Sequence, residues 1–204
     1  RDIEPANLMI CVYGGIPDFL KVLDFGLVKD IGAVESAPEG KSVAGPVDAA
    51  LSQDGTLLGT PLYLAPEGMS DPAAVDARAD IFALGAVGYF LLTGHSPFPG
   101  RTAIEVFAME RQGAPPLAQA AHPVPAALEE TIRRCLAFRR ESRPASAEAL
   151  EAMLDACAVT PPWSREDAKT WWRDRGPRAL EAASGEREEK GQTLVVSSQS
   201  RVRS

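Results

Sequence analysis

Three polar side chains near the start of the chain are of the types that bind a hard divalent cation. Asp2 and Asn7 stand just before a short apolar run, and Asp24 stands just after a second one. The two runs flank Gly14-Gly15, so they predict a small hairpin whose open end brings the three side chains together. Carboxylate and amide oxygens are ligands that Mg²⁺ prefers, together with waters and phosphate oxygens. The spacing therefore predicts a magnesium and phosphate site at the open end of the hairpin.

Each part of this site also has an ordinary structural interpretation. The triplet Asp24-Phe25-Gly26 is compatible with a simple turn, and Asp2 followed by Asn7 is compatible with a helix cap. The order of several such segments along the chain is more specific than any one of them.

The order of motifs resembles that of the protein kinase family. Arg1-Asp2 followed by Asn7 resembles the end of the catalytic-loop motif, and Asp24-Phe25-Gly26 resembles the metal-binding triplet. Ala65-Pro66-Glu67 resembles the motif that closes the activation segment. Further matches follow in the family's order: Gly59-Thr60-Pro61-x-Tyr63, Asp80 with Gly85, and Arg143-Pro144. The resemblance covers residues 1–157 and is strongest to bacterial serine/threonine protein kinases.

The resemblance implies a role for each matched residue. Asp2 would accept the proton of the substrate hydroxyl and orient it toward the γ-phosphate of ATP. Asn7 and Asp24 would hold the cofactors, each binding Mg²⁺ at the nucleotide phosphates. Thr60 would help to position Asp2 and the hydroxyl, which favours Ser and Thr residues of protein substrates. In this reaction, positioning and neutralisation of phosphate charge supply most of the rate.

The activation segment, residues 24–67, contains further implied sites. Arg1 would contact a phosphorylated residue there, with Thr56 the first candidate and Ser52 the second. An equal alternative is that both hydroxyls are ordinary solvated loop groups. Glu67 and Arg143 would form a buried ion pair that anchors the segment to the helical body.

Two features depart from the family pattern. Glu4 stands where serine/threonine kinases usually have a lysine, and a carboxylate there would repel the phosphates of ATP. The chain also contains no G-x-G-x-x-G phosphate loop, and no strand lysine with a helix glutamate partner is recognisable. The expected fold class is therefore mainly α with a small β-hairpin, a protein-kinase-like C-terminal lobe lacking its N-lobe. Such a lobe is expected to be inactive alone.

Helical periodicity dominates the middle of the chain. Residues 80–93 are apolar almost all round, which predicts a helix at the centre of the domain. Thr102 and Glu105 have capping-box spacing, and the face expected in the core there consists of Ile104, Phe107 and Ala108. Two further helices are predicted after Pro125 and after Ser146. Their expected core residues are Leu128, Ile132, Cys135, Leu136, Leu150, Met153, Leu154 and Cys157.

The last part of the chain is expected to extend the domain. A short helix begins at Ser164, carries Trp171 and Trp172, and is expected to stop at Gly176-Pro177. The tryptophans either pack back onto the body or form a docking patch. These patterns give a kinase C-lobe over residues 1–158, a helical extension over 159–183 and a disordered tail over 184–204.

Composition excludes several classes of protein. A net charge of −7 without a basic face argues against nucleic acid as a partner. The longest apolar run, residues 81–93, is too short to cross a membrane. Cys11, Cys135 and Cys157 contain no CxxC pair, which argues against disulfides or structural zinc and fits a reducing, cytoplasmic setting. The expected partners are ATP and protein substrates.

Two other functions remain open from the sequence. Glu4 is also compatible with a pseudokinase or scaffold lobe that binds protein partners without catalysis. A helical interaction module unrelated to kinases would require the motif order to be coincidence, and would not bring Asp2, Asn7 and Asp24 together.

Overall fold

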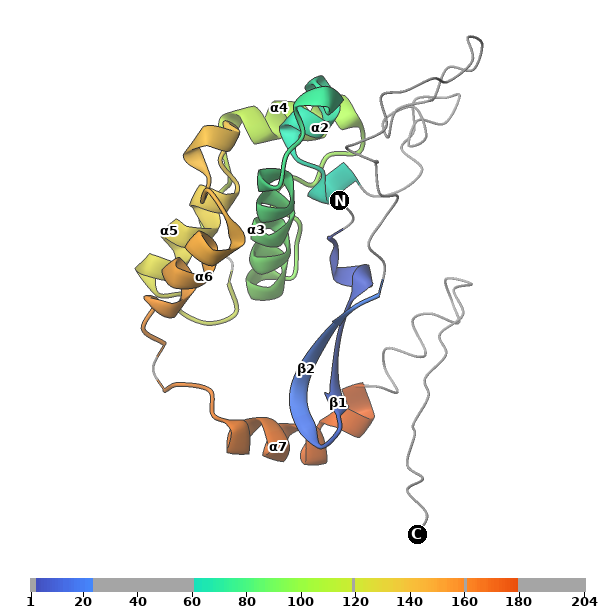
Figure 1. The fold of residues 1–204 in the computed structure, drawn as a ribbon, viewed down its shortest axis with the longest axis vertical. Coiled ribbons are helices and arrows are strands. Elements are labelled where there is room, and N and C mark those ends of the chain that lie inside the picture. Colours follow the sequence, from blue (N-terminus) through green and yellow to red (C-terminus); the bar gives the residue numbers. More distant parts are fainter. Residues whose placement is uncertain (1–2, 24–60, 119, 160, 180–204) are drawn as a thin grey trace, which may run out of the picture. The chain divides into compact units, whose positions relative to one another are not determined.

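The computed structural model describes residues 3–23, 61–118, 120–159 and 161–179 (Figure 1). The chain divides into two compact units. The first contains residues 1–9 and 20–160, and the second contains residues 10–19 and 161–204. The described parts are mostly helical with one two-stranded sheet, so the expected combination of helices and a small hairpin is confirmed.

The hairpin consists of β1 (Leu8–Tyr13) and β2 (Ile16–Val22). The turn falls on Gly14 and Gly15, whose φ angles of 57° and 77° lie in the left-handed region that glycine adopts without steric cost. The predicted hairpin is confirmed, and its returning strand starts at Ile16, directly after the turn. A two-residue turn lets pairing resume at once, and so it lengthens the strand.

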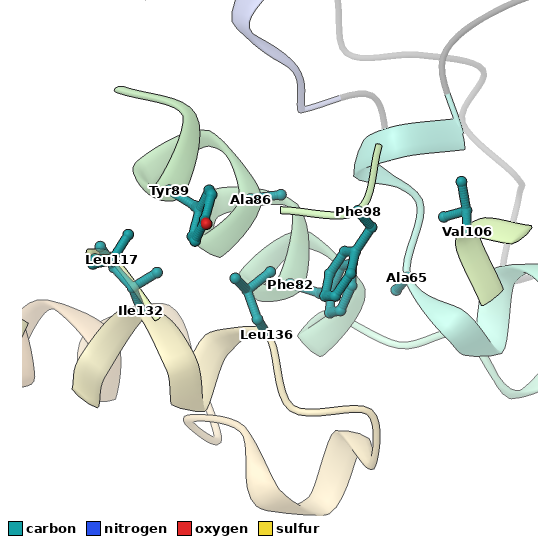
Figure 2. Packing of buried hydrophobic residues seen from close by; sticks show 9 residues of the cluster. All are labelled: Ala65, Phe82, Ala86, Tyr89, Phe98, Val106, Leu117, Ile132 and Leu136. Carbon is teal, nitrogen blue, oxygen red and sulfur yellow. The ribbon is translucent and has the colours of Figure 1, made fainter. Parts of the chain in front are cut away.

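The first unit is built around α3 (Arg78–Thr93). Phe82, Ala86 and Tyr89 on this helix belong to one apolar core, shown in Figure 2. The remaining members are Ala65, Phe98, Val106, Leu117, Ile132 and Leu136. The rings of Phe82 and Phe98 stack with centroids 6.0 Å apart. The prediction of a buried central helix is confirmed.

The other elements of this unit surround α3. They are η2 (Pro61–Tyr63), α2 (Pro66–Ser70), η3 (Pro72–Ala74), α4 (Ala103–Gln112), α5 (Ala126–Cys135), η4 (Arg140–Ser142) and α6 (Ala147–Asp155). α5 packs along α3, and α6 packs against α5. Gly85 makes the first contact close, because a Cβ atom placed there would lie 2.6 Å from Cβ of Cys135. This close approach is the physical reason for glycine at position 85.

The predicted core face of α4 is wrong. Ile104 is 82% exposed, whereas Val106 and Glu110 are both fully buried at 0%. Thr102 does cap the helix, accepting a hydrogen bond from the Glu105 backbone N–H at 3.2 Å. The face was misjudged because α4 packs on α2 and η2, and those contacts bury a side that carries a glutamate.

The helices after Pro125 and Ser146 begin where predicted. Ile132, Cys135 and Leu136 are buried as expected, and so is Leu150. Leu154, however, is 43% exposed, so its assignment to the core is wrong. It lies near the end of α6, where the helix has fewer neighbours.

In the second unit, α7 covers Arg165–Asp174. Ser164 and Asp167 form the expected capping box. The expected stop at Gly176-Pro177 is wrong: the helix ends at Asp174, and residues 176–179 form another helical turn. Proline is tolerated there because the first turn of a helix needs no N–H partner. No helix within the described ranges is long and apolar enough to cross a membrane.

Candidate functional site

The structure describes part of the predicted site. Asn7, Glu4, Glu67 and Arg143 lie within the described residues. The other predicted site residues, Arg1, Asp2, Asp24, Ser52, Thr56 and Thr60, lie outside them.

Asn7 closes the open end of the hairpin. Its backbone carbonyl accepts a hydrogen bond from the Leu23 N–H at 2.8 Å, and its own N–H donates to the Glu4 carbonyl at 3.0 Å. The short 3₁₀ turn η1 (Pro5–Asn7) makes this possible, because Pro5 sets the backbone at its first position. Asn7 is therefore held beside the residue that directly precedes Asp24 in the sequence.

The carboxylate of Glu4 lies close enough to the segment before α2 for its charge to act on Tyr63. The pKa of Tyr63 is raised, first by burial of the phenol and second by the negative charge of Glu4. Tyr63 lies in η2 and packs against the apolar core. Glu4 and Tyr63 therefore share one region of the first unit.

Glu67 and Arg143 form a buried, bidentate ion pair. Arg143 Nη1 lies 2.7 Å from Glu67 Oε1, and Nη2 lies 2.8 Å from Oε2. Their side chains are 11% and 0% exposed. The pair joins the start of α2 to the chain beyond α5, and it is the pair named from the sequence.

Arg143 uses its full hydrogen-bonding capacity. Besides Glu67, its guanidinium donates to the carbonyls of Ala137, Arg78 and Phe138, at 2.9, 3.0 and 3.2 Å. A guanidinium has five N–H groups, so none is left over. The cation also lies 4.9 Å from the centroid of the Phe82 ring. This network ties the start of α2 to the core.

Sequence reasoning did not identify Glu110 as a notable residue. Its carboxyl is fully buried, and neither oxygen has a hydrogen-bond partner within the described part of the chain. Burial raises its pKa to about 9, against a smaller lowering by the Arg143 charge. Since Arg143 has no donor to spare, the nearby cation does not bind this carboxyl. The sequence offered no signal for it, because the predicted core face of α4 was that of Ile104 and not the face shared by Val106 and Glu110.

The predicted magnesium ligands are only partly described. Asn7 supplies an amide oxygen of the type Mg²⁺ prefers, while Asp24 lies outside the described residues. Within the described ranges, no group of three or more His, Cys, Asp or Glu side chains is placed to hold a metal ion.

Comparison with known proteins identifies the family. Residues 1–154 match the protein kinase domain. Serine/threonine-protein kinase pkn3 of Myxococcus xanthus is 35% identical over 159 residues, and Pkn1 of the same organism is 38% identical over 157 residues. Serine/threonine-protein kinase PknL of Mycobacterium tuberculosis is 33% identical over 159 residues.

These alignments cover most of this chain and a minor part of each relative. They span 76%, 76% and 78% of this chain, but 27%, 20% and 35% of pkn3, Pkn1 and PknL. The chain thus spans between a fifth and about a third of the length of these relatives. Because the protein kinase domain matches residues 1–154, about three quarters of the chain, this chain belongs to the protein kinase domain family.

Proposed function

We propose that this chain carries the catalytic loop and activation segment of a serine/threonine protein kinase. The kinase would transfer the γ-phosphate of ATP to Ser and Thr hydroxyls of proteins. The hydrogen bond between Leu23 and Asn7 carries the proposal, because it joins the end of the catalytic-loop motif to the residue before Asp24. The printed names of the relatives, all serine/threonine kinases, support the substrate class.

Each residue in the proposed site has a distinct task. Asp2 accepts and holds the proton of the substrate hydroxyl, and Thr60 positions that hydroxyl beside it. The oxygens of Asn7 and Asp24 have the chemistry to hold Mg²⁺, which neutralises phosphate charge when bound. Glu67 and Arg143 hold the start of α2, the proposed end of the activation segment, to the helical body.

The proposal also concerns the nucleotide-binding lobe that phosphoryl transfer requires. No G-x-G-x-x-G phosphate loop occurs in these 204 residues. Transfer requires the nucleotide phosphates to be covered and paired with a lysine. We therefore propose that these 204 residues act as a C-terminal lobe, and that phosphoryl transfer requires a nucleotide-binding lobe in addition.

Phosphorylation of the activation segment is the proposed means of control. A phosphate on Thr56 or Ser52 would form charge-assisted hydrogen bonds with Arg1 and order the segment. Replacement of both hydroxyl residues by alanine would then lower activity, whereas replacement of either residue by glutamate would restore part of it.

The test is transfer of labelled γ-phosphate from Mg-ATP to a generic protein substrate by the intact protein. Asp2→Asn and Asp24→Asn are each expected to reduce the rate by about 10²–10⁴-fold. Glu141→Gln removes an exposed carboxylate of the same unit and is expected to leave the rate unchanged. Full activity of the Asp24→Asn variant would contradict the proposal. An intact protein without activity despite complete motifs would instead favour the scaffold function.

Glu4 offers a second test of the same site. If its carboxylate repels the transferring phosphate, Glu4→Gln raises the rate, and Glu4→Lys raises it further. A decrease in both variants would mean that the carboxylate is required rather than inhibitory.

A further inference from the structure

One carboxylate in the second unit accepts hydrogen bonds from two tryptophans. The indole N–H of Trp163 donates to Asp18 Oδ2 at 2.8 Å, and that of Trp172 donates to Oδ1 at 2.7 Å. Asp18 lies on β2 near the hairpin turn, whereas the tryptophans lie before and within α7. Figure 1 shows α7 beside the hairpin turn. Each carboxylate oxygen thus has its own donor from the C-terminal segment.

The backbone conformation at Asp18 is unusual for a non-glycine residue, and it accompanies this contact. Its φ of 57° makes it the single non-glycine residue with positive φ among those the structure describes. Such a conformation is unfavourable for L-residues and is tolerated best by Asn and Asp. It persists where surrounding contacts hold it, and it re-aims the side chain within a strand. The two indole bonds are contacts of that kind.

Apolar packing accompanies the hydrogen bonds. Pro17 is buried beside Asp18, and Ala168 on α7 is 2% exposed. Both line a small pocket of about 350 Å³ between the hairpin turn and the start of α7. Gly176 lies against the ring of Trp172, since a Cβ atom placed there would come within 2.9 Å of it. Apolar side chains from the turn and from α7 therefore lie side by side next to the two hydrogen bonds.

The hairpin needs such a partner. A two-stranded hairpin is at best marginally stable alone in water. On β1, Ile10 and Val12 are 54% and 50% exposed, so the tip does not bury its own apolar side chains. With α7 in place these two side chains stay exposed, whereas Pro17 at the turn is buried, so the packing that α7 supplies is confined to the turn.

We propose that residues 161–175 form a clasp, a tryptophan-bearing segment that docks on the hairpin turn of the same chain through Asp18 and orders the hairpin. The clasp makes the C-terminal segment an intrachain binding partner with a defined site: one carboxylate that takes two indole donors. Since the strands of this hairpin begin after Asn7 and end before Leu23, opening the clasp loosens the closure that Asn7 makes. The docking itself does not depend on phosphoryl transfer, so a test of the clasp is independent of a test of the proposed kinase activity.

Hydrogen–deuterium exchange of the 204-residue chain tests the clasp. Asp18→Asn keeps the size of the side chain and its tolerance of positive φ, but turns one acceptor into a donor that faces an indole N–H. We expect amides of β1, β2 and α7 to exchange about tenfold faster in this variant, with α3 unchanged. Trp172→Phe is expected to have the same effect, because it deletes one donor and keeps an aromatic ring.

Trp171→Phe is the matched control. Trp171 packs edge-on against Trp172 at 5.2 Å, and its indole nitrogen donates to no residue that the structure describes. Its replacement is expected to leave exchange in the hairpin unchanged. Unchanged exchange in Asp18→Asn, or equal effects of the two tryptophan variants, would overturn the proposal. So would an equal loss of protection in α3, which would make Asp18 a determinant of the whole fold. Hairpin protection that rises with protein concentration would also overturn it, in favour of exchange between copies.

Discussion

Two charged side chains join distant parts of this chain, and they do so in opposite environments. Arg143 in the first unit is 3% exposed and donates to one carboxylate and three carbonyls. Asp18 in the second unit is exposed and accepts from two indoles, one of them on a tryptophan that is 62% exposed. Water can replace the partners of Asp18 when they leave, but it has no access to those of Arg143. The first contact is therefore suited to permanent structure and the second to reversible docking.

The largest effect is expected from breaking the buried pair. Arg143→Met leaves the Glu67 carboxylate buried without its cation, which typically costs about 3–5 kcal/mol. Chemical denaturation should show this loss in the free energy of unfolding of the first unit. Arg139→Met, at an exposed position, is the control and should change stability by less than about 0.5 kcal/mol.

A double variant sharpens this test. Adding Glu67→Leu to Arg143→Met removes the uncompensated charge and should recover a large part of the loss. If the double variant is as unstable as the sum of both single variants, the cost lies in packing rather than in the unpaired charge.

The next effect concerns Glu110 and depends on pH. The folded chain holds this carboxyl protonated with a pKa of about 9, while the unfolded chain releases the proton near pH 4.5. Its contribution to stability is therefore full below about pH 4.5 and is lost as pH rises toward 9, by at most about 1.4 kcal/mol per pH unit. The stability of Glu110→Gln relative to the parent should rise by about 4 kcal/mol between pH 5 and pH 8.

Denaturation at several pH values measures that difference. The matched variant Glu130→Gln, on the exposed side of α5, should show no comparable slope. A pH-independent difference between Glu110→Gln and the parent would show that position 110 is ionised or solvated in the folded chain.

A steric test of the first unit comes third. Gly85→Ala places a methyl group 2.6 Å from Cβ of Cys135, so α3 and α5 must separate, which costs about 1–3 kcal/mol. Gly88→Ala meets Ile132 at 3.6 Å, an ordinary contact, and gains helix propensity. In thermal unfolding, Gly85→Ala should melt at a lower temperature than the parent and Gly88→Ala at a higher one. Similar melting temperatures of the two variants would contradict the close helix contact.

The smallest effect is expected in the second unit. Ser164→Ala removes the cap of α7, whose hydroxyl accepts from the Asp167 N–H at 3.1 Å. The loss should be about 1 kcal/mol and confined to local exchange in α7. Ser164→Asp can still cap the helix and should restore protection. Loss of stability in α3 would contradict the separation of the two units.

The sequence predicted much of the fold because the relevant signals are local. The turn at Gly14-Gly15, the caps at Thr102, Ser146 and Ser164, and the apolar run of α3 are each specified by neighbouring residues. The pairing of Glu67 with Arg143 came from family resemblance, since no local rule connects positions so far apart. The roles of Asp2, Asp24 and Thr60, and the absence of an N-lobe, stay predictions.

The hairpin, the five longer helices and the family motifs could be recognised in the sequence alone, since backbone propensity and capping act over a few residues. The tertiary structure alone decided which face of α4 is buried, and with it the neutral Glu110 and the exposed Ile104. It also decided that Asp18 takes the indoles of Trp163 and Trp172. Both outcomes depend on which surfaces meet after folding. The free energy of a charge or an apolar side chain is set by those neighbours, and the order of residues along the chain does not record them.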